Sequence, residues 1–181
     1  MGQIQGRKCA WVALGCLLAA SPAHAGGILD EVRLGVLGHD IGLGVHHRED
    51  GVDLNGELLF AVPPPLDKLG AFAPRPHLGV TVNSGGKNSF VYGGLTWTLP
   101  LGRFFGNLGF GGAVHDGPDQ SVTDDHKGLG TRFLFHESLE LGWRLTADLR
   151  ISFYLEHVSN ADTGTHNPGL TNAGLRMGFT F

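Results

Sequence analysis

A histidine and a serine stand two positions apart near the C-terminal end of the chain, as His157 and Ser159. A histidine that reaches a serine hydroxyl can act as its general base, and this pairing activates a nucleophile that is weak alone. The spacing suits such chemistry in an extended strand, where residues i and i+2 lie on one face roughly 6.5–7 Å apart. The surrounding elements therefore decide what the pair can do.

The segment before the pair is predicted to be such a strand, because apolar and polar residues alternate with period two. The apolar positions are Leu149, Ile151, Phe153 and Leu155, and the positions between them are Arg150, Ser152, Tyr154 and Glu156. His157 and Ser159 are the next two members of the apolar series. We therefore expect both side chains on the apolar face of the strand.

The same alternation recurs along the whole chain. It marks eight segments, near residues 31–39, 52–61, 76–83, 89–99, 104–115, 131–143, 147–159 and 171–181. A tilted strand needs about 9–11 residues to cross the hydrocarbon layer. An even number of such strands, apolar on one face and polar on the other, is typical of transmembrane barrels. We predict an all-β fold, an eight-stranded antiparallel outer-membrane β-barrel over residues 26–181, with a soluble periplasmic lipocalin-like barrel as the alternative.

This barrel would place the histidine–serine pair at its outer rim. Both termini of an eight-stranded barrel lie in the periplasm, so the segment 147–159 runs outwards and ends in the pair. A polar pair that faces lipid is costly without a purpose. An outer-leaflet lipid presents its acyl esters at this rim, which favours a lipid-ester hydrolase. The competing interpretation is a rim pair that only contacts the headgroup layer.

The first 25 residues are predicted to be a signal peptide. Arg7 and Lys8 form a basic start, residues 9–20 are apolar, and residues 23–25 supply an A-x-A cleavage site. The apolar run is shorter than the roughly 20 residues that span a bilayer. Both cysteines lie inside this segment, so the mature chain is expected to have no thiol, disulfide or cysteine metal site.

Composition excludes several function classes. Without residues 1–25 the chain has 11 basic and 17 acidic residues, a formal charge of −6, which argues against nucleic acid as a partner. Glycine accounts for 27 of the remaining 156 residues, well above the usual share of about 7%, and suits the bends of a small barrel. No histidine or cysteine spacing matches a zinc motif. We expect no metal or other cofactor.

The stretch 153–161, with the sequence FYLEHVSNA, is followed by Asn-Pro-Gly-Leu at 167–170 and by a closing strand to Phe181. This arrangement resembles the lipid A 3-O-deacylase (PagL-like) family, whose members are eight-stranded outer-membrane barrels that remove an ester-linked acyl chain from lipid A. The resemblance implies that Ser159 is the nucleophile, His157 its base, and Asn160 a residue near the oxyanion site. It implies lipid A of lipopolysaccharide and the outer membrane as partners; a second copy of the chain is a further candidate.

The sequence departs from the family at the acidic residue that orients the histidine. Family members place this acid about a dozen residues beyond the serine, where this chain has Thr171 and Asn172. Asp162, Asp124, Asp125 or the amide of Asn172 could take the role. Loss of the acid from a triad can cost around 10⁴ in rate. An inactive relative, or a structural or adhesive barrel, therefore stays open as the alternative to an enzyme.

One acidic residue interrupts the apolar face of the segment 131–143. Glu137 stands between Phe135 and Leu139 in the alternating series. A β-bulge adds one residue to a strand and re-aims a side chain. We expect a bulge that turns Glu137 into the barrel, with a catalytic carboxylate as the alternative.

Overall fold

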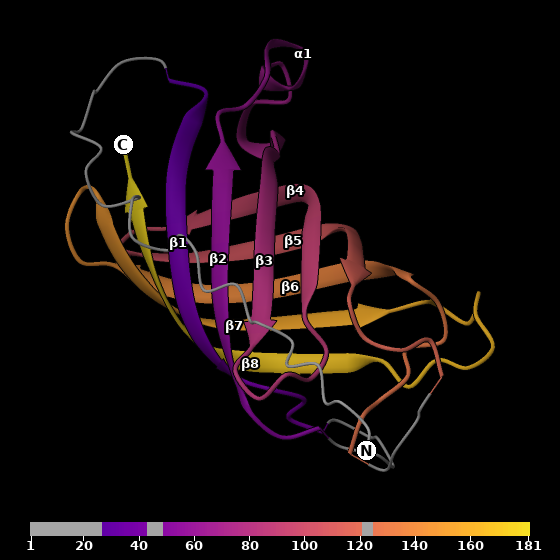
Figure 1. Ribbon diagram of the computed structural model, residues 1–181. Coiled ribbons are helices and arrows are strands. Elements are labelled where there is room, and N and C mark those ends of the chain that lie inside the picture. The colour runs from indigo at the N-terminus through magenta and orange to yellow at the C-terminus, as the bar shows by residue number, and fades with distance from the viewer. Residues whose placement is uncertain (1–26, 43–48, 121–124) are drawn as a thin grey trace, which may run out of the picture.

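The computed structural model describes residues 27–42, 49–120 and 125–181 (Figure 1). The predicted signal peptide and Asp124 lie outside these residues. A closed antiparallel barrel accounts for most of the described chain. Within the ranges that the structure describes, no helix is long and apolar enough to cross a membrane.

Eight strands form the barrel within the described ranges. They are β1 (Leu29–Gly38), β2 (Val52–Phe60), β3 (Arg75–Asn83), β4 (Phe90–Leu101), β5 (Phe104–His115), β6 (Phe133–Arg144), β7 (Leu149–Ser159) and β8 (Leu170–Thr180). Each strand pairs with the next, and β8 pairs with β1, so that the sheet closes. In Figure 1, β1–β3 stand nearly upright while β4–β7 cross behind them at a steep angle, as expected of a strongly twisted sheet. The predicted eight-stranded barrel is confirmed.

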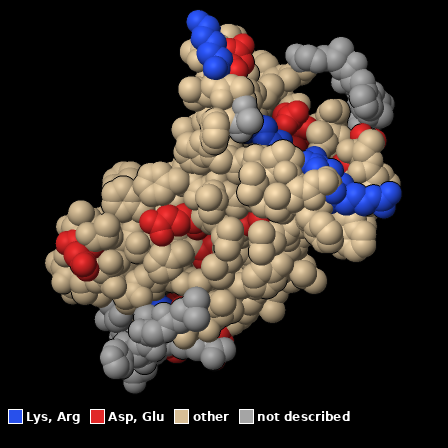
Figure 2. All heavy atoms as spheres, turned by 180° about the vertical axis from the view of Figure 1, so that it is seen from behind, with Lys and Arg blue, Asp and Glu red and all other residues tan. Residues whose placement is uncertain are grey.

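Alternate residues of each strand face the lumen and the outside. On β7, Tyr154 is 1% exposed, whereas the preceding Phe153 is 52% exposed. The outward residues of the other strands are also mainly large and apolar. Two examples are Phe133 of β6, which is 72% exposed, and Leu175 of β8, which is 70% exposed. Figure 2 shows broad uncharged areas on one face, with Lys and Arg mostly in the upper part of the view. The apolar residues therefore cover the outside of this barrel.

The lumen is filled by charged side chains that neutralise one another. The buried guanidinium of Arg33 on β1 donates to Glu31 Oε1 at 2.8 Å, Glu57 Oε1 at 3.1 Å and Glu140 Oε2 at 2.8 Å. These carboxylates come from β1, β2 and β6. An eight-stranded barrel has an interior just wide enough to be filled by side chains, and Arg33 joins its opposite walls.

Two glycines allow β4 and β5 to approach closely. Gly94 and Gly111 are register partners on these strands. A Cβ added at Gly94 would stand 2.2 Å from the carbonyl oxygen of Phe110, and one added at Gly111 would stand 2.1 Å from that of Gly93. A side chain at either position would collide with backbone, so the curvature of the barrel at this point requires glycine.

The two ends of the barrel differ. At the terminal end, where β1 begins and β8 ends, the connection between β2 and β3 forms α1 (Pro64–Asp67) and the short 3₁₀ helix η1 (Gly70–Phe72). In Figure 1, α1 and the C-terminus lie towards this end. At the opposite, loop end, β7 finishes in Ser159, and the chain passes from β1 to β2, from β3 to β4, from β5 to β6 and from β7 to β8.

The expected bulge at Glu137 is absent, and that prediction is wrong. Strand β6 keeps an unbroken register with β5 from Phe133 to Trp143, and with β7 from Phe135 to Arg144. Glu137 therefore keeps the outward parity of its neighbours and is exposed on the outer wall. The strand accommodates the carboxylate on its apolar face.

The orientation in the membrane can be tested with single cysteines. Because both chain ends of such a barrel face the periplasm, a cysteine at Asp119, in the connection after β5, should react on whole cells with a membrane-impermeant thiol reagent. A cysteine at Asp67 of α1 should not react. The protein without an added cysteine is the control, and the reverse labelling pattern would show that the barrel is inserted the other way.

The importance of the lumenal charges can be tested at Arg33. Arg33→Leu leaves buried carboxylates without their shared cation, and breaking a buried ion pair in this way costs about 3–5 kcal/mol of unfolding free energy. Arg103→Leu, at an exposed turn residue, should cost less than about 1 kcal/mol. Urea unfolding in detergent micelles measures both, and equal losses would contradict the assigned role of Arg33.

Candidate active site

His157 and Ser159 lie on the outer face of β7, as their parity predicts. Both side chains are partly exposed, whereas Val158 between them and Asn160 after them are buried on the inner side. Although they share this face, the two side chains form no hydrogen bond with each other in the described structure. Contacts between catalytic groups are often long before substrate binds and tighten in the complex. The placement is therefore compatible with a nucleophile and its base.

The imidazole of His157 is held by Thr171 on β8. These two residues are register partners, and His157 Nδ1 lies 2.8 Å from Thr171 Oγ1. When Nδ1 carries the proton and donates to this oxygen, Nε2 keeps the lone pair that a general base needs. Asn172 instead faces inwards, where its amide donates to Glu156 and its carbonyl accepts from the Asp40 backbone.

The loop before β8 supports the other edge of the imidazole. Gly169 has a φ of +60°, and a Cβ added there would stand 2.8 Å from His157 Cε1. The carbonyl of Gly169 accepts from Lys127 Nζ at 3.1 Å, and the same ammonium pairs with Asp40 at 2.7 Å. Lys127 and Asp40 are both buried. A buried ion pair thus fixes the backbone that packs against the histidine.

Asn160 connects the loops of the loop end. Its Nδ2 donates to the carbonyls of Leu129 at 2.9 Å and His166 at 2.7 Å, and its backbone N–H donates to Asn167 Oδ1 at 3.0 Å. The side chain is 1% exposed. Both amide protons are therefore engaged on the inner side of the strand, and the oxyanion role of Asn160 stays a prediction.

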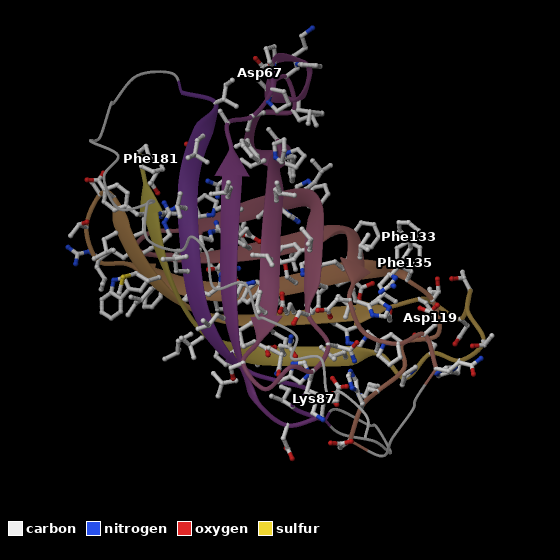
Figure 3. All side chains as sticks on the ribbon, viewed as in Figure 1. Asp67, Lys87, Asp119, Phe133, Phe135 and Phe181 are labelled. Carbon is white, nitrogen blue, oxygen red and sulfur yellow. The ribbon has the colours of Figure 1, made fainter. Side chains whose placement is uncertain are left out.

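On the other side of the pair, β6 presents one aromatic and one acidic side chain. Phe135 is the register partner of Ser159, and Glu137 is the register partner of His157. Figure 3 shows Phe133 and Phe135 pointing away from the barrel. Phe135 also lines a concavity of about 700 Å³ that extends over the glycines of β4 and β5. The pair therefore lies beside an apolar hollow on the outer wall.

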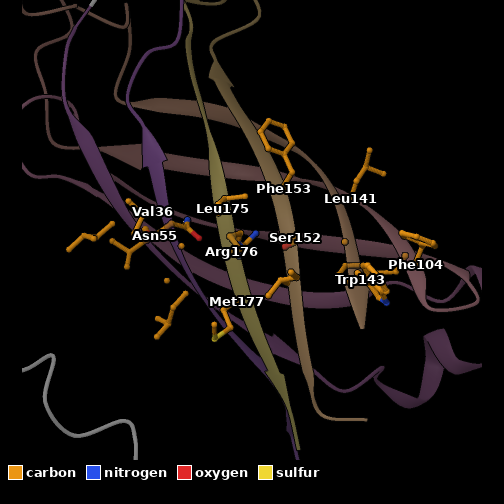
Figure 4. Close-up of a pocket in the computed structure, with 18 of the residues that line it drawn as sticks. Val36, Asn55, Phe104, Leu141, Trp143, Ser152, Phe153, Leu175, Arg176 and Met177 are labelled. Atoms are coloured by element: carbon orange, nitrogen blue, oxygen red, sulfur yellow. The ribbon is translucent and has the colours of Figure 1, made fainter. Parts of the chain in front are cut away.

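A larger apolar concavity of about 1240 Å³ lies elsewhere on the outer wall, and its lining includes neither His157 nor Ser159. Figure 4 shows Leu175 and Met177 of β8 at its centre, with Val36 of β1 on one side and Trp143 of β6 on the other. The size of a hollow therefore does not identify the reactive site in this molecule.

A second polar cluster closes the loop end of the lumen. His39 Nδ1 lies 2.8 Å from Asp53 Oδ2, and His39 Nε2 lies 2.8 Å from Glu49 Oε2. Burial alone would lower the pKa of His39, but the hydrogen bonds to Asp53 and Glu49 outweigh it and raise this pKa to about 9. Glu49 also accepts from the backbone N–H of Lys127 at 2.6 Å. Across the ranges that the structure describes, no cluster of histidine, cysteine or acidic residues is arranged to hold a metal ion.

The contacts of the histidine depend on strand register, which the sequence alone did not give. Thr171 and Glu137 face His157 from the two neighbouring strands. The alternation placed Glu137 on the outer face, but its charge led to the wrong expectation of a bulge. No sequence signal pointed to the Lys127–Asp40 pair, which joins residues far apart in the chain.

Comparisons with known proteins agree with the barrel fold. The model of the lipid A 3-O-deacylase (PagL) family matches residues 68–180, a range that includes His157, Ser159 and Thr171. No curated protein matches the chain. Among solved structures, the outer membrane enzyme PagL is similar in fold, with a TM-score of 0.59 and 15% identity, over 83% of this chain and 99% of that chain.

Two further barrels are similar in fold. A de novo designed transmembrane β-barrel has a TM-score of 0.50 and 12% identity, over 87% of this chain and 98% of that chain. Neisserial surface protein A (NspA) has a TM-score of 0.50 and 7% identity, over 84% of this chain and 95% of that chain.

The raised pKa of His39 predicts a pH dependence of stability. The pKa in the folded protein, about 9, lies above the ordinary value of 6.5, so the contribution is complete below about pH 6.5 and is lost as the pH rises through about 9. The difference in unfolding free energy between the protein and His39→Gln should therefore shrink from pH 7 to pH 10, by roughly 3 kcal/mol at most. A difference that stays constant over this range would contradict the charged state of His39.

Proposed function

The chain belongs to the lipid A 3-O-deacylase (PagL) family, and from this premise we propose that it hydrolyses an ester-linked acyl chain of lipid A by a serine–histidine mechanism. The protein is a β-barrel of the bacterial outer membrane. The observation that carries the proposal is the placement of His157 and Ser159 side by side on the outer wall, with the histidine held through Nδ1 by Thr171. A lipid in the same leaflet can reach this wall by lateral diffusion.

In the first half of the proposed reaction, Ser159 Oγ attacks the ester carbonyl while His157 Nε2 takes the hydroxyl proton. The tetrahedral intermediate then collapses and expels the sugar alkoxide, which takes the proton from Nε2. An acyl group remains on Ser159. Water repeats the sequence in the second half, giving the free fatty acid and the original serine.

Thr171 would orient the imidazole ring of His157 for this reaction. The hydrogen bond to Thr171 is made by Nδ1, so Nε2 can accept the serine proton. A threonine hydroxyl can donate as well as accept, so it orients the ring without adding charge. In the proposal, Thr171 therefore supplies the orientation that a triad acid supplies elsewhere.

Asn160 is proposed to lie next to the oxyanion, because it directly follows the nucleophile. An oxyanion donor must stand about 2.7–3.1 Å from the developing charge. The two amide protons of Asn160 are bonded to Leu129 and His166 in the structure. One of these bonds would have to be exchanged for the substrate oxygen, so removal of the amide should leave part of the rate.

We further propose that residues 1–25 direct export and are removed, so that the mature chain begins at Gly26. The basic start, the apolar run and the A-x-A sequence support this proposal.

The serine–histidine mechanism can be tested by substitution. Ser159→Ala and His157→Ala should each lower kcat for release of an ester-linked fatty acid from lipid A by about 10⁴-fold or more, and the double variant should lose no more than either alone, because the two groups act as a unit. Mass spectrometry of lipid A measures the release, both in cells and in detergent micelles. Heat-resistant mobility on gels should be unchanged, since neither side chain supports the barrel.

Ser152→Ala is the matched control, because Ser152 lies on the same strand but faces the lumen, where it donates to Glu140. It should remain active. Full activity of Ser159→Ala would exclude this serine as the nucleophile. If the folded, unsubstituted protein released no acyl chain from lipid A, the structural or adhesive barrel would be the better interpretation.

A further inference from the structure

The mechanism above leaves one charged residue of the outer wall unused. Glu137 is exposed on β6. The other acidic residues in the strands that the structure describes are buried, except Asp30 at the terminal end of β1, which pairs with Arg75 at 2.6 Å. The outward neighbours of Glu137 are apolar: Phe135 and Leu139 along β6, and Phe110 opposite on β5. A charged side chain on the lipid-facing wall of a barrel is unfavourable, most of all away from the interface. We therefore looked for a neighbouring group with which the Glu137 carboxylate could interact.

His157 is that partner by position. The two residues are directly opposite each other on β6 and β7, and facing side chains in an antiparallel pair have Cβ atoms about 4.5–5.5 Å apart. The unbroken register of β6 with both neighbouring strands fixes this juxtaposition. Thr171 faces the same histidine from β8. The base therefore stands between a hydroxyl on one side and a carboxylate on the other.

We propose that Glu137 is a positioning residue for the reaction, whose negative charge stabilises the imidazolium of His157 while Thr171 orients the ring. This inference rests on the proposed function. In a serine triad one acid holds the histidine and also stabilises the cation that forms. The hydroxyl of Thr171 on β8 holds the ring at Nδ1 but carries no charge. The task of stabilising the cation therefore falls to Glu137 on β6.

The charge balance of the reaction supports this division. When the proton of Ser159 moves to Nε2, a cation forms on His157 and a negative oxygen forms on the tetrahedral intermediate. Glu137 takes no proton in either step of the proposed reaction. When the sugar alkoxide leaves with the proton, His157 is neutral again. The carboxylate therefore favours the charged intermediate over the resting state, which lowers the barrier.

The other charged groups near His157 do not replace Glu137. Lys127 and His136 also act electrostatically on His157, but both would oppose a cation there. Lys127 is buried and paired with Asp40, and the His136 ring points into the lumen towards Glu156 at 3.3 Å. Glu137 is the acidic group that faces the histidine on the outer wall.

Kinetics of Glu137→Gln on lipid A in detergent micelles tests the inference. We expect kcat to fall about tenfold, with KM changed less than about twofold, because a neighbouring charge changes the basicity of a histidine by about one unit or more. The acidic limb of the pH–rate profile should move to lower pH by roughly one unit. Glu137→Asp should restore most of the rate. Thr171→Val should lower kcat without moving the acidic limb.

Two controls separate this effect from surface charge and from folding. Asp119→Asn removes an exposed charge from the connection after β5, at the same end of the barrel, and should change neither kcat nor the acidic limb. Glu137→Leu places an apolar side chain on the lipid-facing wall, so it should fold at least as stably as the unsubstituted protein. It should nevertheless show the same loss of kcat as Glu137→Gln. An unchanged kcat in Glu137→Leu would overturn the inference.

A measurement without turnover distinguishes this inference from the proposed function. NMR titration of ring-labelled histidine, with the His157 signal assigned through His157→Ala, should show its midpoint moving to lower pH in Glu137→Gln. If the unsubstituted protein released no fatty acid but the midpoint moved, the proposed function would fail while the coupling of Glu137 to His157 stood. If the protein were active and neither kcat nor the midpoint changed, the inference alone would be overturned.

Discussion

Closure of the sheet between β8 and β1 is the constraint on which the rest of this molecule depends. In lipid, no water satisfies an open strand edge, so the backbone must bond to itself around the full circle. Closure also divides each strand into two faces, one in the lumen and one in the membrane. Arg33 and its three carboxylates occupy the first, and Leu175 and its apolar neighbours the second. A polar residue on the outer, apolar face is therefore an exception that needs an explanation.

Parity and register together define the site. Parity places His157, Ser159 and Glu137 on the apolar side of the wall. Register then decides which of them meet, because each outward residue has one direct neighbour on each adjoining strand. His157 consequently lies between Thr171 and Glu137. The loops add a third support from within, where the Lys127 ammonium holds the carbonyl of Gly169 behind the imidazole.

The strands and the outward placement of His157 and Ser159 could be predicted from the sequence, because a period of two shows itself within a single segment. The partners of His157 could not, since they depend on how β6, β7 and β8 align. In the sequence, Thr171 was noted only because it stands where the family places an acidic residue. The bulge predicted at Glu137 was wrong, because the carboxylate keeps its outward place directly opposite His157 on β7. The contact of Asn160 with Leu129, in the connection between β5 and β6, had no local sequence signal.

In the wall of a barrel, a histidine can be contacted by side chains from both neighbouring strands. A side chain on a strand can be contacted from the strand before it and from the strand after it. The facing Cβ atoms are about 4.5–5.5 Å apart, closer in the pair that is not hydrogen-bonded. An acid on either side places a negative charge near the ring. Acids on both sides would repel each other across the histidine and would put two charges against lipid. In the proposed mechanism, the hydroxyl of Thr171 would supply one orienting bond to His157, and the carboxylate of Glu137 would supply one negative charge beside it.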